Sequence, residues 1–332
     1  MDIIASSPND VNQILPHRYP QFWELYIVGR NNDWNPDEIP MGKDAAQWKG
    51  EALTDQERNL VKRVLGLFVC GESLVSNNLF LNVFRFLNSG EARQYMTRQA
   101  FEEALHNHTV VYCCDSLNLD IEEVYEAYKG IESIKGIKKF LASNTSDLST
   151  MSLDLSTPND VRWYLLNLVV FYMICEGFLF YTAFVSMLAL SRRDLMVGIG
   201  EQIDYTMRDE ANHVEFGSEL IRLIKKQMPE VWTDEFKADL NHLFEEAIDH
   251  AHAFADDMLS LGIVGLNRES MSNYIEFMSQ RRMASIGLVP LNTAIKNPFP
   301  WVKSAVELEK QSNFFEAKPK TYQSAGALVD DF

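Results

Sequence analysis

The chain has 332 residues, of which 46% are hydrophobic, so it can bury a large core as one domain or two. Its formal net charge of -17 argues against a nucleic-acid surface and against binding to anionic lipid. Sixteen glycines and eleven prolines, many of them near the ends or between periodic segments, favour long helices over a sheet with many turns. An all-α fold is therefore expected.

Residues 1–50 are rich in Pro, Asn and Asp and predict an N-terminal arm of loops and short turns. Residues 51–296 form the predicted helical domain, which begins at Thr54-Asp55-Gln56-Glu57, a stretch typical of a capped helix start. Residues 297–332 are expected to be an irregular, flexible tail. The first predicted helices run from about Thr54 to Leu87, Gly90 to Leu117 and Asp120 to Tyr128, and a short one follows Ile131. A polar loop at about 143–160 leads into the helix that contains Glu176. The last three predicted helices run from about Arg192 to Lys226, Asp234 to Leu261 and Arg268 to Ile286.

One segment has the length and composition of a membrane span. Between Trp163 and Leu190 the only ionised residue is Glu176, and we expect no other segment of the chain to share this profile. The acid lies near the middle, and no run of Lys or Arg flanks the segment. These features favour a fully buried central helix and no membrane association.

The cysteines and the N-terminus indicate a cytoplasmic protein. The four cysteines lie in apolar helical stretches without a Cys-x-x-Cys spacing, which is typical of buried, reduced thiols. The first residues contain no basic region followed by an apolar run, so export is not expected.

Two copies of Glu-x-x-His are the most informative motif: Glu103 with His106, and Glu210 with His213. Residues three apart project from the same face of a helix, so each pair offers one oxygen and one nitrogen to a common point. A lone pair of this kind arises by chance. Here, however, each pair is preceded by a carboxylate inside apolar sequence, first Glu72 and then Glu176.

The apolar surroundings of these acids argue for metal binding. An unpaired carboxylate at Glu72 or Glu176 would have to be desolvated, at a cost of several kcal/mol, or become neutral. A divalent metal ion removes that penalty. The four Glu and two His therefore predict a dinuclear metal site in the core of a four-helix bundle, with four unrelated buried acids as the alternative.

Several stretches identify a family. In order and at family-like separations, the chain resembles the small, radical-generating subunit of class I ribonucleotide reductase, a ferritin-like protein. The resemblance implies that the metal ligands are Glu72, Glu103, His106, Glu176, Glu210 and His213. The matching stretches are EIPMGKDAAQW, ESLVSNNL, RQAFEEALHNHT, RDEANHVEFG and NFFEAKPKTYQ.

Two positions depart from the usual family pattern. Val110, four residues after His106, stands where most members have the tyrosine that holds a stable radical, and Glu72 stands where many have Asp. A valine cannot be oxidised to a persistent radical. The departures resemble class Ic, in which a manganese-iron pair stores the oxidising equivalent in a high-valent state. The hard, oxygen-rich ligand set suits Mn and Fe, and it leaves a di-manganese or di-iron site open.

The resemblance also implies an electron path to a separate large catalytic subunit. Asp209 corresponds to the acid that bonds His106, and Trp34 to the tryptophan beyond it. Tyr205 matches a class Ic tyrosine linked to reduction of the metal site, and Tyr322 matches the tyrosine that relays the equivalent between subunits. The tail ending in ALVDDF resembles the family's docking peptide, and a homodimer is expected.

Each path residue has a simpler interpretation. Trp34 would anchor the arm on the bundle, Asp209 would be a solvated acid, and Tyr205 would pack in the core. Tyr322 would be only a mobile residue of the tail. Three further histidines follow no ligand pattern and are assigned to structure: His108, His250 and His252.

Three functions compete. The leading one is an enzyme subunit that activates O2 at a Mn/Fe centre and delivers the oxidising equivalent to a large subunit that reduces ribonucleoside diphosphates. The alternative is a ferritin-like ligand-binding Mn/Fe oxidase with a lipid-like ligand in its core. The third is a metal-storage or structural ferritin-like protein, which the apolar residues around the ligands oppose. No Gly-rich phosphate loop is evident, so nucleotides are expected to bind elsewhere.

Overall fold

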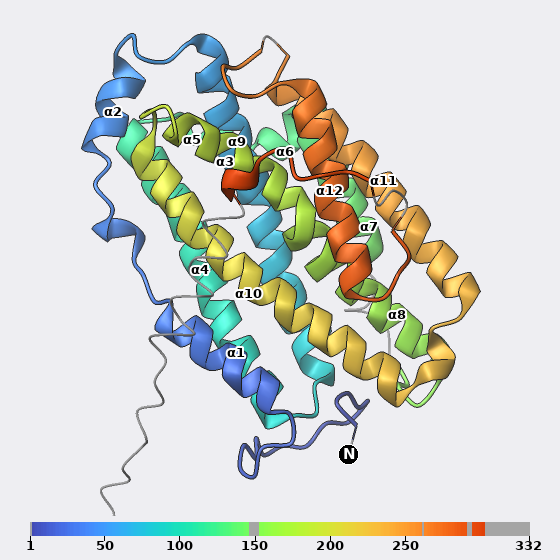
Figure 1. The fold of residues 1–332 in the computed structure, drawn as a ribbon. Coiled ribbons are helices and arrows are strands. Elements are labelled where there is room, and N and C mark those ends of the chain that lie inside the picture. The colour runs from blue at the N-terminus through green and yellow to red at the C-terminus, as the bar shows by residue number, and fades with distance from the viewer. Residues whose placement is uncertain (1, 146–152, 261, 291–293, 303–332) are drawn as a thin grey trace, which may run out of the picture. The chain divides into compact units, whose positions relative to one another are not determined.

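A computed structural model describes residues 2–145, 153–260, 262–290 and 294–302 (Figure 1). Within these ranges the regular structure is helical, apart from two isolated β-bridges. The helices labelled in Figure 1 lie in one compact unit, Met1–Pro298, and the all-α prediction is confirmed. The boundaries at residues 50 and 296 stay predictions. Most of the predicted tail, including Tyr322, lies outside the described residues.

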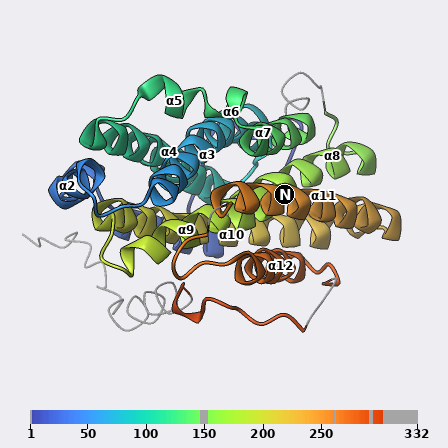
Figure 2. The ribbon, with the colours of Figure 1, turned by 90° about the horizontal axis from the view of Figure 1, so that it is seen from above.

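Four long helical segments form the core and pack side by side (Figure 1, Figure 2). The third of them is one continuous helical run that changes from α-helix to π-helix and back. In the core, α3 contacts α4 and α9, while α10 contacts α4, η5 and α9. The segments are α3 (Asp55–Asn78), α4 (Gly90–Leu117), the run of α8 (Pro158–Leu168), η5 (Val169–Leu179) and α9 (Phe180–Ser191), and α10 (Val197–Gln227).

Outer helices cover this core. α12 (Arg268–Ser285) and α11 (Asp234–Met258) pack on η5, and α7 (Glu132–Thr145) lies against α3 and α11. Burial of apolar residues on the inner faces of these helices stabilises the arrangement. The remaining elements are short: α2 (Gly42–Lys49), α5 (Ile121–Tyr125), α6 (Ala127–Gly130), η1 (Pro36–Glu38), η2 (Leu79–Val83), η3 (Phe84–Phe86) and η6 (Pro229–Val231).

The apolar segment around Glu176 is a core helix. The most apolar part of Pro158–Ser191 is entirely buried inside the protein, as the sequence predicts. All eleven residues of the π-helix η5 are buried. The expectation that no other segment shares this profile is wrong, because Asp55–Phe86 is also long and apolar enough to span a membrane, with 67% of its window buried. Both are explained as core helices of a bundle.

The interpretation of the first 50 residues as loops and short turns is wrong. They contain α1 (Pro20–Asn31), which starts with a proline at its first position and buries Phe22. α1 lies along α4 and α10 so closely that a Cβ atom at Gly29 would be 3.0 Å from Glu102 Oε1. A twelve-residue helix is marginal by itself, so this contact with the core, which sequence patterns do not reveal, decides its formation.

Helix starts follow their capping residues. Thr54 and Glu57 form the predicted capping box of α3, and Ser89 caps α4. By contrast, α10 begins at Val197 rather than near Arg192 as predicted, because Asp194 and Met196 adopt left-handed backbone conformations with φ of 63° and 50°.

A residue distant in sequence caps α10. The buried carboxylate of Asp44, on α2, accepts hydrogen bonds from the backbone N–H groups of Gly198 at 3.0 Å and Ile199 at 2.8 Å. A negative charge at a helix N-terminus is stabilised by the unpaired N–H groups and by the helix dipole. Asp44 therefore ties the N-terminal arm to the helix that carries Glu210 and His213.

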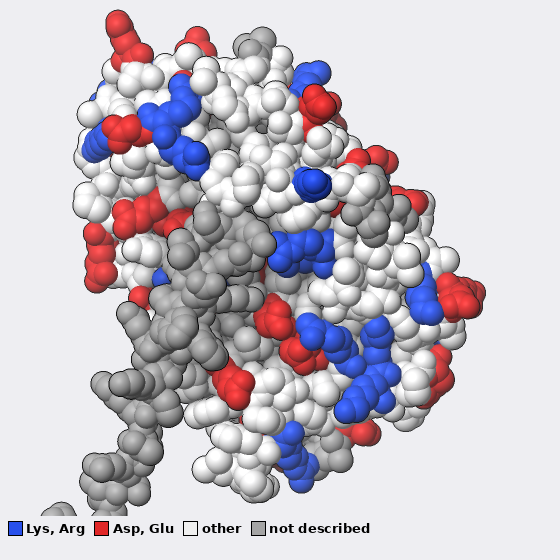
Figure 3. All heavy atoms as spheres, viewed as in Figure 1, with Lys and Arg blue, Asp and Glu red and all other residues white. Residues whose placement is uncertain are grey.

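The surface carries charges of both signs. On the face shown in Figure 3, Lys and Arg side chains stand among Asp and Glu side chains, with broad uncharged areas between them. Over the whole chain, acidic residues outnumber basic ones by 47 to 30.

We expect Asp44→Ala to lower the free energy of unfolding by about 1–2 kcal/mol, because two N–H groups at the start of α10 lose their acceptor. The midpoint of urea denaturation, followed by circular dichroism, measures the change. Asp10→Ala, which removes an exposed carboxylate, is the control and should leave the midpoint unchanged. An equal effect of both variants would contradict the capping role.

Candidate metal centre

The six predicted ligands meet in the middle of the bundle. α3 carries Glu72, α4 carries Glu103 and His106, the π-helix η5 carries Glu176, and α10 carries Glu210 and His213. Each of the six residues is at most 2% exposed. π-helical turns occur frequently at functional sites, and here η5 places a carboxylate opposite the two Glu-x-x-His helices.

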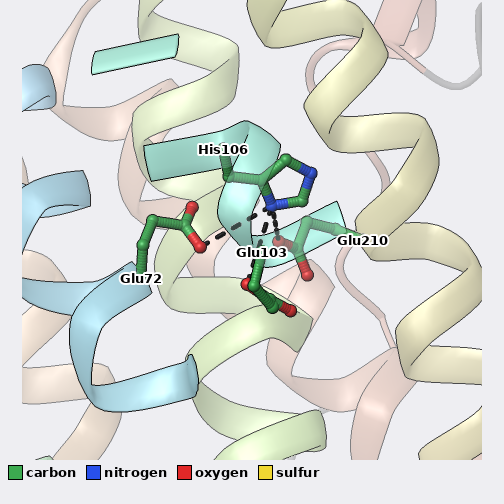
Figure 4. Close-up of side chains that lie close together, drawn as sticks. All are labelled: Glu72, Glu103, His106 and Glu210. Atoms are coloured by element: carbon green, nitrogen blue, oxygen red, sulfur yellow. Dashed lines mark ion pairs between the residues drawn. The ribbon is translucent and has the colours of Figure 1, made fainter. Parts of the chain in front are cut away.

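The first group of ligand atoms surrounds the inner nitrogen of His106 (Figure 4). His106 Nδ1 lies 3.6 Å from Glu72 Oε2, 3.7 Å from Glu103 Oε2 and 3.3 Å from Glu210 Oε1. One atom from each of these residues lies within 4.8 Å of the others. Three helices thus converge on one position that a metal ion can occupy.

A second group adjoins the first and shares Glu103 with it. His213 Nδ1 lies 3.3 Å from Glu103 Oε1, 3.9 Å from Glu176 Oε2 and 3.2 Å from Glu210 Oε2. Glu103 and Glu210 each turn one oxygen toward each imidazole, so both carboxylates face both groups. The centroids of the two imidazole rings are 6.0 Å apart.

The donor atoms fit a pair of metal ions. Several of them are buried without a hydrogen-bond partner among the described residues, including both oxygens of Glu72 and Nδ1 of His106. Such atoms cost free energy unless something compensates them, and a cation does so. Carboxylate oxygens and imidazole nitrogens are ligands that Mn and Fe accept.

The pKa shifts of the cluster also favour a bound cation. Burial raises the pKa of Glu72 and Glu176 well above the usual range of a carboxyl group. Burial opposes the charged form of both histidines, yet the neighbouring carboxylates raise the pKa of His106 and His213 well above the usual range. Without a cation the cluster therefore retains protons, and a metal ion would displace them on binding.

Three of the predicted path residues, Asp209, Trp34 and Tyr205, lie in a row of contacts that begins at His106. His106 Nε2 is 3.5 Å from Asp209 Oδ2, and the same oxygen accepts a hydrogen bond of 2.8 Å from Trp34 Nε1. The ring of Tyr205 lies 5.4 Å from that of Trp34, centroid to centroid. Asp209 is only 1% exposed, so its interpretation as a solvated acid is wrong. Trp34 does anchor the arm, and it does so through this buried carboxylate.

The structure describes Val110 but not Tyr322. Val110 is 2% exposed on α4, one turn beyond His106, and offers no group that can be oxidised. Tyr322 lies outside the described residues, so its relay role stays a prediction. The three histidines assigned to structure lie outside both ligand groups: His108 is 3.5 Å from Asp37, His250 packs on Phe140 and His252 lies 3.2 Å from Ser272.

Sequence reasoning missed Glu102. Its Oε2 lies 2.9 Å from the outer nitrogen of His213, and its Oε1 accepts a hydrogen bond of 2.8 Å from Arg98. Burial tends to raise the pKa of Glu102, but the His213 and Arg98 contacts outweigh it and hold the pKa below its usual value. Arg98 also pairs with Asp33 at 2.9 Å. The four-residue spacing of Arg98 and Glu102 on one helix was the available signal.

The outer nitrogens of both imidazoles face buried acids, at 2.9 Å in a hydrogen bond for His213 and at 3.5 Å without a hydrogen bond for His106. Each directs Nδ1 at the ligand cluster and Nε2 at a buried acid, Asp209 for His106 and Glu102 for His213. Such an acid fixes the tautomer and the orientation of a metal-binding imidazole.

Known proteins are similar to this chain in sequence and in fold. The family described as "Ribonucleotide reductase, small chain" matches residues 11–298. Ribonucleoside-diphosphate reductase subunit beta of Chlamydia pneumoniae is 41% identical over 319 residues, which cover 96% of this chain and 92% of that protein. The ribonucleotide reductase R2 subunit from Clostridium botulinum has a TM-score of 0.84 at 24% identity, over 92% of this chain and 94% of that one.

A second kind of protein has a related fold. A variant of an R2-like ligand-binding oxidase, with an aerobically reconstituted Mn/Fe cofactor, has a TM-score of 0.67 at 20% identity. The match covers 82% of this chain and 95% of that one. At this identity the likeness concerns the fold.

We expect Glu102→Ala to weaken Mn2+ binding by about 10- to 100-fold, because His213 loses the acceptor that orients it. Equilibrium dialysis of the purified chain against Mn2+ measures the affinity. Glu215→Ala, at a partly exposed position on α10, is the control. Unchanged Mn2+ affinity in Glu102→Ala would show that His213 is held by other contacts.

Proposed function

The chain belongs to the ribonucleotide reductase small-chain family, and on this premise we propose that it activates O2 at a Mn/Fe centre. The oxidising equivalent formed there starts ribonucleoside diphosphate reduction in a separate large subunit. The observation that carries the proposal is the paired ligand cluster with a chain of polar contacts leading out of it, from His106 to Asp209 at 3.5 Å and from Asp209 to Trp34 through a hydrogen bond.

The proposed ligand assignment follows from the two groups of donor atoms. Glu72 and His106 would hold one ion and Glu176 and His213 the other, with Glu103 and Glu210, which face both histidines, contributing their carboxylates. Oxygen donors dominate this set, and anionic oxygens stabilise the higher oxidation states of Mn and Fe.

Val110 supports a metal-based oxidant. The side chain is buried one turn beyond His106, where most members of the family are expected to have a radical-forming tyrosine. This valine cannot hold a radical, so the residues of the ligand cluster would hold a Mn/Fe pair whose redox chemistry would supply the one-electron oxidant. We therefore propose a class Ic type of small subunit.

The chain of contacts beyond His106 suits electron transfer. Trp34 donates its indole N–H to Asp209, so a proton shared between Nε1 and the carboxylate can compensate a change of charge on the ring. Tyr205 lies against Trp34 on the side of α10 and is less buried, and the Arg208 guanidinium lies 4.9 Å from its ring. We propose that Trp34 carries the equivalent outward and that Tyr205 serves reduction of the metals.

The partners follow from the family. We propose that the chain forms a homodimer and that residues 297–332 dock on the large subunit, with Tyr322 relaying the equivalent across the contact. The four cysteines are buried and not paired with one another, which supports a reducing, cytoplasmic location.

A second candidate is the ligand-binding oxidase. The fold likeness to the R2-like oxidase with its Mn/Fe cofactor favours it. The 41% identity to a reductase subunit beta over nearly the whole chain favours the reductase role more strongly. A storage role is disfavoured, because the ligands lie among apolar residues such as those of η5.

Loading with Mn and Fe together, followed by exposure to O2, should yield one Mn and one Fe per chain. Electron paramagnetic resonance after one-electron reduction should then show a coupled heterodinuclear signal and no tyrosyl radical, because Val110 replaces the phenol. Two metals of one kind, or a tyrosyl radical, would overturn the assignment of the oxidant.

Trp34→Phe should abolish ribonucleotide reduction with a cognate large subunit while leaving the Mn/Fe signal intact, because phenylalanine has no N–H for Asp209 and is harder to oxidise. Trp48→Phe, also in the N-terminal region but next to Arg58, is the matched control and should keep its activity. Full activity of Trp34→Phe with the large subunit would contradict the proposed role of Trp34 in the path.

A further inference from the structure

A buried amide joins two of the candidate ligands from outside the cluster. Gln99, four residues before Glu103 on α4, is completely buried. Its Nε2 lies 3.4 Å from Glu103 Oε1 and 3.3 Å from Glu176 Oε1, so one amide group donates to carboxylates from two helices. Both carboxylates also face Nδ1 of His213.

The usefulness of this amide depends on its orientation. The oxygen and nitrogen ends of a glutamine have nearly the same shape, and only hydrogen bonds distinguish them. If the amide of Gln99 were reversed, its oxygen would face two carboxylates and repel them. Something must therefore hold the oxygen end on the other side.

Tyr172 supplies that hold. Its hydroxyl donates to Gln99 Oε1 at 3.0 Å, and it also lies 3.3 Å from Met96 Sδ. A hydroxyl has one proton, and an amide oxygen is a much better acceptor than a thioether sulfur, so the proton goes to Gln99. Burial raises the pKa of Tyr172 well above its usual range, which keeps the hydroxyl protonated as a donor.

The ring of Tyr172 has a fixed place. It is completely buried on η5, four residues before Glu176, and lies 5.8 Å from the ring of Phe216. On α10, Gly217 faces it so closely that a Cβ atom there would overlap the ring. The glycine thus admits the aromatic ring between the two core helices, and close packing fixes the direction of its hydroxyl.

We infer that Tyr172 is a positioning residue, which sets the orientation of Gln99 and through it holds the carboxylates of Glu103 and Glu176 for the metal ion next to His213. This inference rests on the proposed metal centre and adds to it a polar support for two of the carboxylates. The hydroxyl of Tyr172 bonds Gln99 and none of the candidate ligands, so its effect should pass through Gln99.

The same aromatic cluster offers a matched control. Tyr95, on α4, is also completely buried and stacks on Phe216 at 4.2 Å. Its hydroxyl has no hydrogen-bond partner among the described residues. Removing that hydroxyl deletes one buried oxygen near the centre but leaves Gln99 untouched.

The first test is a Mn2+ titration of the full chain, with free Mn2+ measured by electron paramagnetic resonance. Tyr172→Phe should weaken binding by about 10-fold, in the range typical of lost support around metal ligands. Tyr95→Phe should stay within about 2-fold of the wild type, since no support is lost. Equal affinity of Tyr172→Phe and the wild type would overturn the inference, even if the radical chemistry of the variant were altered.

A double-mutant cycle tests the route through Gln99. Gln99→Leu alone should weaken Mn2+ binding at least as much as Tyr172→Phe, and adding Tyr172→Phe to it should have no further effect. Additive losses would overturn the inference, because Tyr172 would then act independently. If the circular dichroism spectrum of Gln99→Leu differs from that of the wild type, Gln99→Met replaces it. If neither Gln99 variant folds, the comparison of Tyr172→Phe with Tyr95→Phe decides whether the inference holds.

The wild-type titration separates this inference from the proposed function. Failure of the wild type to bind Mn2+ would overturn the metal centre itself. Normal binding by the wild type and by Tyr172→Phe would overturn only the role of Tyr172.

Discussion

The burial of four carboxyl groups and two imidazoles in one apolar core is the constraint on which the rest of the structure depends. Charged groups taken out of water cost several kcal/mol each unless they are paired or bind metal. The inner faces of all four core segments contribute to this cluster, so a gap between any two helices would expose it. Tight packing keeps water from the cluster, and a bound metal ion would offset the free-energy cost of burying its charges.

Support for the cluster extends outward to the N-terminal arm. Trp34 donates a hydrogen bond to Asp209, the acid next to His106. Its neighbour Asp33 pairs with Arg98, which holds Glu102, the acid next to His213. Two consecutive residues of the arm therefore reach the outer nitrogens of both imidazoles through separate polar chains. This explains why a segment far from the ligands in sequence lies so close to α4 and α10.

Much of the core was predictable because local signals determine it. The start of α3 at Thr54 and the start of α4 after Ser89 follow from side chains that cap helix ends, and both lie where the sequence places them. The spacing of Glu-x-x-His likewise put each ligand pair on one helix face. In contrast, the helix α1 and the late start of α10 escaped prediction, because contacts with distant elements, such as Asp44 on the N–H groups at Gly198, decide them.

The sequence by itself determined the all-α class, the six candidate ligands and the absence of an oxidisable group at Val110, because periodicity, spacing and residue chemistry are local properties of the chain. Only the tertiary structure decided which atoms support those ligands. Glu102, Gln99 and Tyr172 have no motif, and their roles arise from side-chain directions set by helix packing. Hydrogen bonds act over about 3 Å, so residues distant in sequence acquire such roles only when the fold brings them to that distance.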